Sequence, residues 1–254
     1  MKITLLQRKG RTSTSAFTTT LNNNLSGMKG NLSVTWKITE PSPRGWTTID
    51  IQGTDQEIFH HLVKQKFPVA NSNFESVEKH GIYGGQISRF NHDLEVDLGI
   101  EIPDQVNVMV RLGSLRAQLT DGQPVPVKDI QEAYCLFPGI KADVRITAIS
   151  HDEPILSAWL ADSQIDVFSN WIHSGLDRLI IFNCTIEELD LAIRETALER
   201  DILAVESPTL TTHAITCKLG TDGVGVIPRL GTVLRKSEIK LFIPKRALTL
   251  SRSW

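Results

Sequence analysis

Two stretches near the middle of the chain alternate apolar and polar residues. The first is Gly81–Phe90, and the second, Leu94–Ile100, follows after the turn-prone residues Asn91, His92 and Asp93. An alternation with a period of two indicates antiparallel strands that bury one face. The pattern therefore predicts a hairpin at the start of a β-rich segment.

The same segment continues to about residue 150. The pattern predicts a third strand over 106–119 that runs past Gly113, a short helix over 127–136 and a return strand over 140–149. Four short strands, with a helix between the third and the fourth, are typical of a small barrel.

The residues before this segment predict an α/β unit. A strand over 3–6, a weak helix over 12–27 and a hairpin over 32–52 precede a capping box at Thr54–Glu57. The helix that follows has an expected core-facing stripe of five apolar residues: Ile58, Leu62 and Phe67, with Phe59 and Val63 beside them.

The residues after the segment predict a second α/β unit. A helix over 158–173 ends before Gly175, and a buried strand over 179–182 precedes a second capping box at Thr185–Glu188. That box opens a helix to about Glu199, and strands follow over 202–205, 213–217 and 238–243. The sequence therefore predicts an α+β fold with three parts: 1–76 and 158–254 as small ferredoxin-like α/β units, and 77–157 as a central five-stranded barrel.

Three stretches of this barrel, Gly81–Phe90, Leu94–Ile100 and Pro138–Ile149, resemble an RNA-binding module of the OB-fold class. This module is named after the largest small-subunit ribosomal protein (the S-one-type domain). The resemblance covers about seventy residues and implies that the barrel binds RNA. In an OB-type barrel the second and third strands and the neighbouring loops form the oligonucleotide face.

Composition excludes several classes of protein. Apolar residues make up 41% of the 254 residues and charged residues 22%, which are ordinary globular values. No run approaches the eighteen apolar residues of a membrane span, and the start is unlike a signal peptide. Cys135, Cys184 and Cys217 are odd in number and far apart, which suits a reducing cytosol. We expect a cytoplasmic protein with no metal and no cofactor.

Charge is segregated along the chain. Residues 1–50 hold seven Lys/Arg against two Asp/Glu, residues 151–212 hold three against twelve, and residues 228–254 hold seven against one. Basic patches at both ends could contact a polyanion such as RNA. Alternatively, the acidic helices pair with the basic ends inside one fold.

Candidate RNA-binding residues on the barrel are Phe90 and His92, supported by Arg89, Arg111 and Arg116. Flat side chains stack on unpaired bases, and cations follow the phosphates. The alternatives are a core residue for Phe90 and an exposed turn residue for His92.

The strand after this turn departs from the resembling domain. That domain has an aromatic-Gly-x-aromatic pattern where this chain has Asn91-His92-Asp93-Leu94, so one stacking ring is missing. Asp93, Glu95 and Asp97 also alternate along one face, where they could repel a phosphate backbone.

The C-terminal part contributes further candidates. Four glycines in residues 220–231 form either a tight hairpin or an anion-binding loop, with Lys218 and Arg229 as its phosphate contacts. Pro228 is expected to block a helix there. Lys245 and Arg246 belong to the basic section 228–254, which we expect to supply much of the phosphate contact.

Catalysis has little support in the sequence. His60 and His61 are adjacent on a predicted helix and therefore face different directions. The carboxylates of the helix over 185–199 have no histidine or cysteine at ligand spacing. We expect no catalytic residues.

Six short runs also resemble an uncharacterised archaeal protein family: Val96–Ile100, Leu115–Leu119, Gly175–Ile180, Glu199–Ile202, Cys217–Gly223 and Ile227–Gly231. This resemblance implies a cytoplasmic archaeal protein and supplies no active-site residues.

The sequence predicts a non-enzymatic RNA-binding protein of translation, the ribosome or RNA metabolism. RNA, including ribosomal RNA, is the expected partner, in a ribosome or transcription complex and away from membranes. The alternative is an adaptor between proteins of a transcription or translation complex, whose barrel does not bind RNA.

Overall fold

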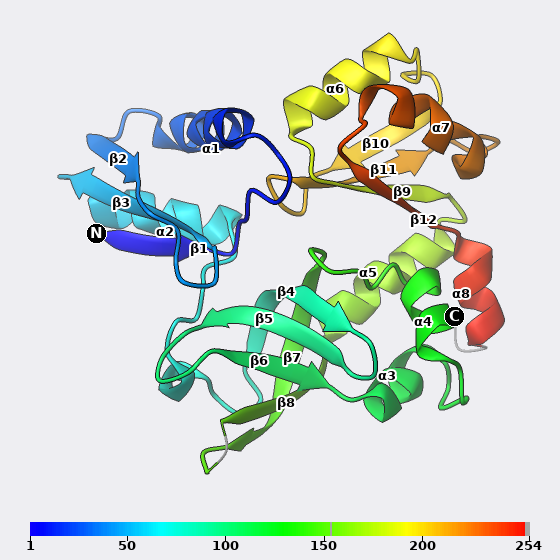
Figure 1. The fold of residues 1–254 in the computed structure, drawn as a ribbon, viewed down its shortest axis with the longest axis horizontal. Coiled ribbons are helices and arrows are strands. Elements are labelled where there is room, and N and C mark those ends of the chain that lie inside the picture. The colour runs from blue at the N-terminus through cyan, green and yellow to red at the C-terminus, as the bar shows by residue number, and fades with distance from the viewer. Residues whose placement is uncertain (153, 252–254) are drawn as a thin grey trace.

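The structure, a computed structural model, describes residues 1–152 and 154–251. Figure 1 shows two α/β units above a β-barrel. The N-terminal unit contains β1 (Lys2–Leu5), α1 (Thr14–Lys29), β2 (Val34–Ile38), β3 (Thr47–Gly53) and α2 (Gln56–Lys66). Its antiparallel sheet has the order β1-β3-β2, and a bridge between Leu5 and Val69 adds the beginning of a fourth strand beside β1. This is the ferredoxin-like arrangement with its last strand reduced to one bridge.

The first predicted capping box does not form. Asp55 is the N-cap residue of α2, but its carboxylate accepts a hydrogen bond from Ser33 N at 2.7 Å and caps no helical N–H. Asp55 therefore binds the segment between α1 and β2 in place of its own helix. Of the predicted stripe, Phe59, Val63 and Phe67 are buried, whereas Ile58 is 56% exposed and does not face the core.

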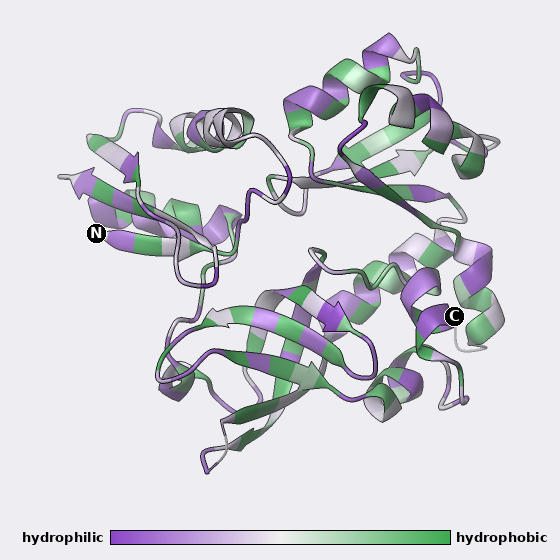
Figure 2. Ribbon diagram, viewed as in Figure 1, coloured by the Kyte–Doolittle hydropathy of each residue, from purple (hydrophilic) through white to green (hydrophobic). Residues whose placement is uncertain are grey.

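The barrel follows a short 3-10 turn, η1 (Phe74–Ser76). Its strands are β4 (Ile82–Phe90), β5 (Leu94–Ile100), β6 (Val106–Val110), β7 (Lys141–Ser150) and β8 (Ile155–Leu160). They close in the order β4-β5-β6-β8-β7, with β6 and β8 parallel. This is the connectivity of the OB-fold, and the fold prediction is confirmed. Bands of hydrophobic and hydrophilic residues alternate along these strands in Figure 2.

The predicted third strand over 106–119 is wrong beyond residue 110. Residues 112–119 form helix α3 (Leu112–Leu119), and Asp93 Oδ1 accepts a hydrogen bond from Leu112 N at 2.8 Å where it begins. Leu115 and Leu119, four residues apart on one helix face, are fully buried under the barrel. The next helix, α4 (Val127–Ala133), is confirmed.

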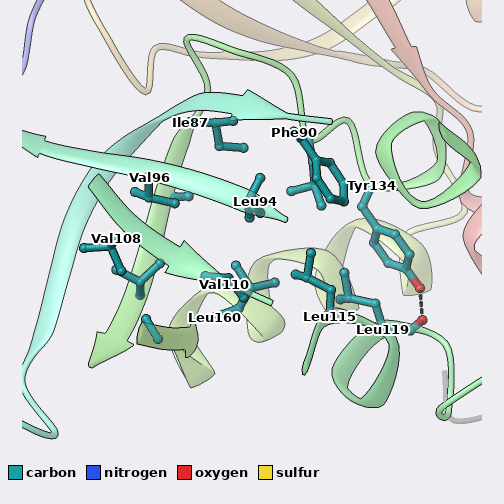
Figure 3. Packing of buried hydrophobic residues seen from close by; sticks show 14 of the residues in the cluster. Ile87, Phe90, Leu94, Val96, Val108, Val110, Leu115, Leu119, Tyr134 and Leu160 are labelled. Carbon is teal, nitrogen blue, oxygen red and sulfur yellow. Dashed lines mark hydrogen bonds between the residues drawn. The ribbon is translucent and has the colours of Figure 1, made fainter. Parts of the chain in front are cut away.

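The sequence pattern does not predict the fifth barrel strand. It predicts a helix over 158–173, but β8 continues to Leu160 and helix α5 covers Asp162–His173. Leu156, Ala158 and Leu160 alternate into the barrel core, whereas Trp159 points outward with 50% of its surface exposed. The barrel core is drawn in Figure 3, where Phe90 lies among the apolar side chains near Tyr134.

The C-terminal unit contains β9 (Arg178–Phe182), α6 (Ile186–Glu195), β10 (Ile202–Glu206), β11 (Thr212–Cys217), α7 (Gly223–Val233) and β12 (Glu238–Phe242). The sheet order β10-β11-β9-β12 is the complete ferredoxin-like order. The second capping box forms as predicted, with Thr185 N donating to Glu188 Oε2 at 2.8 Å. Helix α8 (Pro244–Leu250) then packs on α4 and α5 beside the barrel.

The segment between β1 and α1 joins the two α/β units. Gln7 Oε1 accepts a hydrogen bond from Leu210 N at 2.8 Å, and Thr20 on α1 donates to Glu187 on α6 at 2.6 Å. These two contacts join the units through neutral donors. An ion pair between a basic end and the acidic stretch is that of Arg229 with Asp201, at 3.1 Å. Among the described residues, no helix is both long and apolar enough to cross a membrane.

Candidate nucleic-acid interface

The N-terminal unit covers part of the outer face of β5 and β6. Asp97 on β5 is 1% exposed, although its side chain points out of the barrel. Its Oδ2 accepts from Arg8 Nη2 at 2.8 Å and lies 3.0 Å from Arg44 Nη2, while its Oδ1 accepts from Gly99 N at 2.8 Å. Both arginines belong to the N-terminal unit. Asp97 therefore anchors that unit on the barrel.

Arg44 is bound on several sides. Its Nη1 donates to the carbonyl oxygens of Ile100 at 3.0 Å and Val106 at 3.1 Å, and its Nη2 donates to Asn107 on β6. The Arg8 guanidinium lies 3.5 Å from the centroid of the Trp46 ring, and burial lowers the pKa of Arg8 against the opposing effect of Asp97. An oligonucleotide cannot reach this part of the usual OB face without displacing the N-terminal unit.

The predicted residues of the β4–β5 hairpin have different surroundings. Phe90 is 4% exposed and packs in the barrel core, which is the alternative that the sequence left open. It cannot stack on a base, because its ring is buried among the apolar side chains of the core, near Tyr134 (Figure 3). The side chain of His92 is 89% exposed, and Arg89 is 60% exposed in an ion pair with Glu95.

Arg111 and Arg116 lie on or next to α3. Arg111 is exposed at the N-cap, beside the Asp93–Leu112 hydrogen bond, so the structure brings it close to His92. Arg116 instead donates from Nε at 3.0 Å and from Nη2 at 2.8 Å to the carbonyl of Val125. Its guanidinium stabilises the loop between α3 and α4.

The C-terminal candidates lie on separate elements. Lys218 is exposed after β11, and Lys245 and Arg246 are exposed on α8. Arg229 on α7 pairs with Asp201 at 3.1 Å and donates to the carbonyl of Thr196 at 2.6 Å. These cations do not form one site with the β4–β5 turn. The positions beyond Ser251 in the predicted basic section lie outside the described residues.

Both interpretations of the glycine-rich segment 220–231 are wrong. Residues 223–233 form helix α7, and Pro228 stands inside it. Asp222 Oδ1 accepts from Val224 N at 3.0 Å, and Asp177 Oδ2 accepts from Gly223 N at 3.2 Å. Two carboxylates therefore already occupy the positive end of the helix, where an anion would otherwise bind.

A cavity of about 730 Å³ lies where the three units meet. Lys64 and Lys66 from the end of α2 line one side, and Lys141 from β7 lines another. Tyr83 and Trp171 contribute aromatic rings to the wall. Asn71 also lines the cavity, and its buried Nδ2 has no hydrogen-bond partner among the described residues. The cavity thus combines cations, rings and an unused donor.

The barrel face beside this cavity carries an exposed row of three side chains. Ile82 on β4 is the register partner of Arg145 on β7, and Arg145 is the partner of Trp159 on β8. Ile82 lines the cavity, so the row leads from the cavity onto the barrel. We name Ile82, Lys141, Arg145 and Trp159 the β7 face.

The sequence pattern does not reveal the β7 face, because it assigns Trp159 to a helix. The side chains of the row are accessible: Ile82 is 54% exposed, Trp159 50% and the Arg145 side chain 38%. A large exposed ring next to a cation is suited to stack on an unpaired base while the cation contacts phosphate. Arg145 pairs with Asp162 and Lys141 with Asp143, so either cation would exchange partners on binding.

A serine–histidine pair lies at the β10–β11 turn. His213 Nε2 donates to the Cys184 carbonyl at 3.0 Å, because a carbonyl can only accept, and its Nδ1 then accepts from Ser207 Oγ at 2.8 Å. Burial lowers the pKa of His213, which favours the neutral ring. Both ring nitrogens have partners, so the pair stabilises the turn.

The described part of the chain gives no support for a metal site or a reactive cysteine. It holds no group of three or more His, Cys, Asp or Glu side chains that could bind a metal ion. The three cysteines are buried and free, and burial raises the pKa of Cys135 and of Cys184 to about 12. Both thiols are therefore protonated near neutral pH.

The C-terminal unit is similar to a known family. Residues 176–242 match the DUF2110 C-terminal domain, and this range coincides with β9 to β12. No curated protein matches the chain.

Solved structures give distant similarities. The a/eIF2alpha–aDim2p–rRNA complex from Pyrococcus horikoshii OT3 is 12% identical over 48% of this chain, with a TM-score of 0.27; the chain spans 64% of that structure's length. The intact alpha subunit of aIF2 from Pyrococcus abyssi is 10% identical over 66% of this chain and 98% of its own, with a TM-score of 0.26. A multidomain protein with nucleic acid binding domains from Streptococcus pneumoniae TIGR4 is 11% identical over 70% of this chain and 57% of its own, with a TM-score of 0.22. Scores this low carry no functional argument.

Proposed function

We propose that this chain is a non-enzymatic RNA-binding protein that binds single-stranded RNA along the β7 face and in the adjoining cavity. The observation that carries the proposal is the row of Ile82, Arg145 and Trp159, which is exposed and opens into a cavity lined by Lys64 and Lys66. A fold does not define a function, so the proposal depends on these side chains and not on the barrel as such.

The N-terminal unit covers part of the usual RNA-binding face of the OB barrel, which favours the β7 face as the binding site. Arg8 and Arg44 already neutralise Asp97 there, whereas Ile82 and Trp159 on the β7 face stay exposed in the part of the chain that the structure describes. RNA bases would stack on Trp159, and phosphates would contact Arg145, Lys141 and the two lysines of α2. His92 and Arg111 at the β4–β5 turn, and Lys245 and Arg246 on α8, remain proposed peripheral phosphate contacts. The proposed setting is translation, the ribosome or RNA metabolism.

Fluorescence anisotropy of the full chain with a labelled single-stranded RNA of about 12 nucleotides tests the proposal. We expect Trp159→Ala to weaken binding by about 1–3 kcal/mol, the usual value for one base–aromatic stack. Arg145→Gln should weaken RNA binding more than Trp159→Ala does. Arg89→Gln is the matched control, because Arg89 is also an ion-paired arginine on the barrel surface. A larger decrease in affinity in Arg89→Gln than in Arg145→Gln would move the site to the β4–β5 turn.

The adaptor alternative has one observation in its favour. The N-terminal unit covers Asp97 and contacts Asn107 on the usual RNA-binding face. If the wild-type chain binds neither single-stranded nor structured RNA at about 50 mM salt, RNA binding is excluded and the adaptor function replaces it. The exposed Ile82 and Trp159 would then be its contacts to a protein partner.

A further inference from the structure

A second cavity, of about 400 Å³, lies between the two α/β units and away from the β7 face. Residues 11–13, just before α1, line one side, and residues 233–237, which run from the end of α7 to the start of β12, line the other. Arg11 N donates to Asn183 Oδ1 at 3.0 Å, which holds the first segment against the C-terminal unit. Both units therefore contribute to one site.

Positive charge accumulates in this cavity. Arg11, Arg235 and Lys236 line it, and none of the three forms an ion pair within the described residues. One carboxylate, Glu188, also lines it, but Glu188 Oε2 accepts from Thr185 N in the capping box. Three cations that share one cavity with a single carboxylate leave an excess of positive charge, so an anion that enters would be stabilised.

The backbone and a buried hydroxyl point to the same ligand. Helix α1 has sixteen residues, and its positive end opens at Ser13, which lines the cavity. Ser13 Oγ accepts from Ala16 N at 3.1 Å, while Thr14 N and Ser15 N have no acceptor in the described part of the chain. Thr12, another wall residue, is 5% exposed, and its Oγ1 has no partner among the described residues. An unused hydroxyl beside free N–H groups is suited to an oxyanion.

We propose that this cavity binds a phosphate group. A tetrahedral phosphate accepts from several donors at once, and the guanidinium groups of Arg11 and Arg235 can each donate two parallel hydrogen bonds to it. The helix N-terminus supplies further N–H donors. The bound phosphate would bridge the N-terminal unit to the C-terminal one. This proposal is independent of RNA binding on the β7 face.

Isothermal titration of the full chain with inorganic phosphate, at constant ionic strength, tests the site. Saturable binding is expected in the wild type, and Arg235→Gln/Lys236→Gln should weaken it by at least about 10-fold. Thr12→Val, which removes only the hydroxyl, should weaken it less. The matched control is Arg200→Gln/Lys218→Gln, which removes one arginine and one lysine from exposed positions of the same unit outside the cavity.

Absence of saturable binding in the wild type would overturn the proposal, as would equal affinity of Arg235→Gln/Lys236→Gln and wild type. Weaker binding confined to the Arg200→Gln/Lys218→Gln control would also overturn it.

Adding single-stranded RNA to the phosphate complex identifies the source of the phosphate. If the RNA displaces the bound phosphate, the RNA backbone occupies the cavity. If the phosphate stays bound, the ligand of the cavity is a small phosphate compound. Trp159→Ala should leave the phosphate titration unchanged, which separates this test from that of RNA binding.

Discussion

Asp97 and Arg44 form an ion pair of 3.0 Å between a barrel strand and the β2–β3 loop, with side chains only 2% and 9% exposed. Arg8 shares the same carboxylate oxygen, so one buried anion carries two cations of the N-terminal unit. This contact covers part of the face on which an OB barrel usually binds oligonucleotides.

Asp97→Asn should lower the free energy of unfolding by about 3 kcal/mol, because it leaves Arg44 buried without a counterion. Chemical denaturation measures this value. Arg89→Gln, which breaks an exposed pair with Glu95, should change it by less than about 1 kcal/mol. Equal effects of the two changes would show that the Asp97 contact does not hold the units together.

The salt dependence of RNA binding should distinguish phosphate contacts from base stacking, because only the phosphate contacts release counterions. Lys245→Gln/Arg246→Gln should flatten the log–log salt slope by roughly 0.7 for each single-strand phosphate that the variant no longer neutralises. Trp159→Ala should lower affinity and leave the slope nearly unchanged, since stacking releases no counterions. Anisotropy titrations over a range of salt concentrations check both expectations. A steep change of slope in Trp159→Ala would contradict the stacking role.

His213 should make stability depend on pH. Burial lowers its pKa in the folded state below the ordinary value of 6.5, so the unfolded chain binds a proton first as pH falls. The free energy of unfolding should therefore decrease as pH drops below about 6.5 and continue to decrease until the folded pKa is reached. His213→Gln should remove part of this slope, measured by denaturation between about pH 7.5 and 5.5. An identical slope in the variant would assign it to other groups.

The cysteines should react slowly with a thiol reagent in the folded protein. Cys135 and Cys184 are each 1% exposed, and burial raises the pKa of both to about 12, so little thiolate is present at pH 8. Reaction in denaturant should be much faster and should consume all three thiols. Rapid labelling of the native chain would show that the units around these residues open readily.

Local signals in the sequence determined much of the secondary structure. The Thr185–Glu188 capping box needs only residues within one helical turn, and it forms as predicted. The alternation over Leu94–Ile100 needs only one buried face, and it gives β5. The two α/β units and the barrel strands β4 to β7 follow from such patterns, because the order of strands and helices leaves few ways to bury their apolar faces. The fifth barrel strand, β8, does not.

Tertiary structure decided which residues are available at the surface. Asp97 looked in the sequence like a charge that would repel phosphate, yet Arg8 and Arg44, both far from it along the chain, neutralise it. No local signal in the sequence showed that Trp159 belongs to a strand and not to the start of a helix. The pairing of β8 with β7, in which Trp159 is the partner of Arg145, placed it on the barrel surface. Arg11 and Arg235 are far apart in the sequence and line one cavity only because the two α/β units meet there. Ion pairing, burial and cavities depend on contacts between distant segments, and no local pattern of residues encodes them.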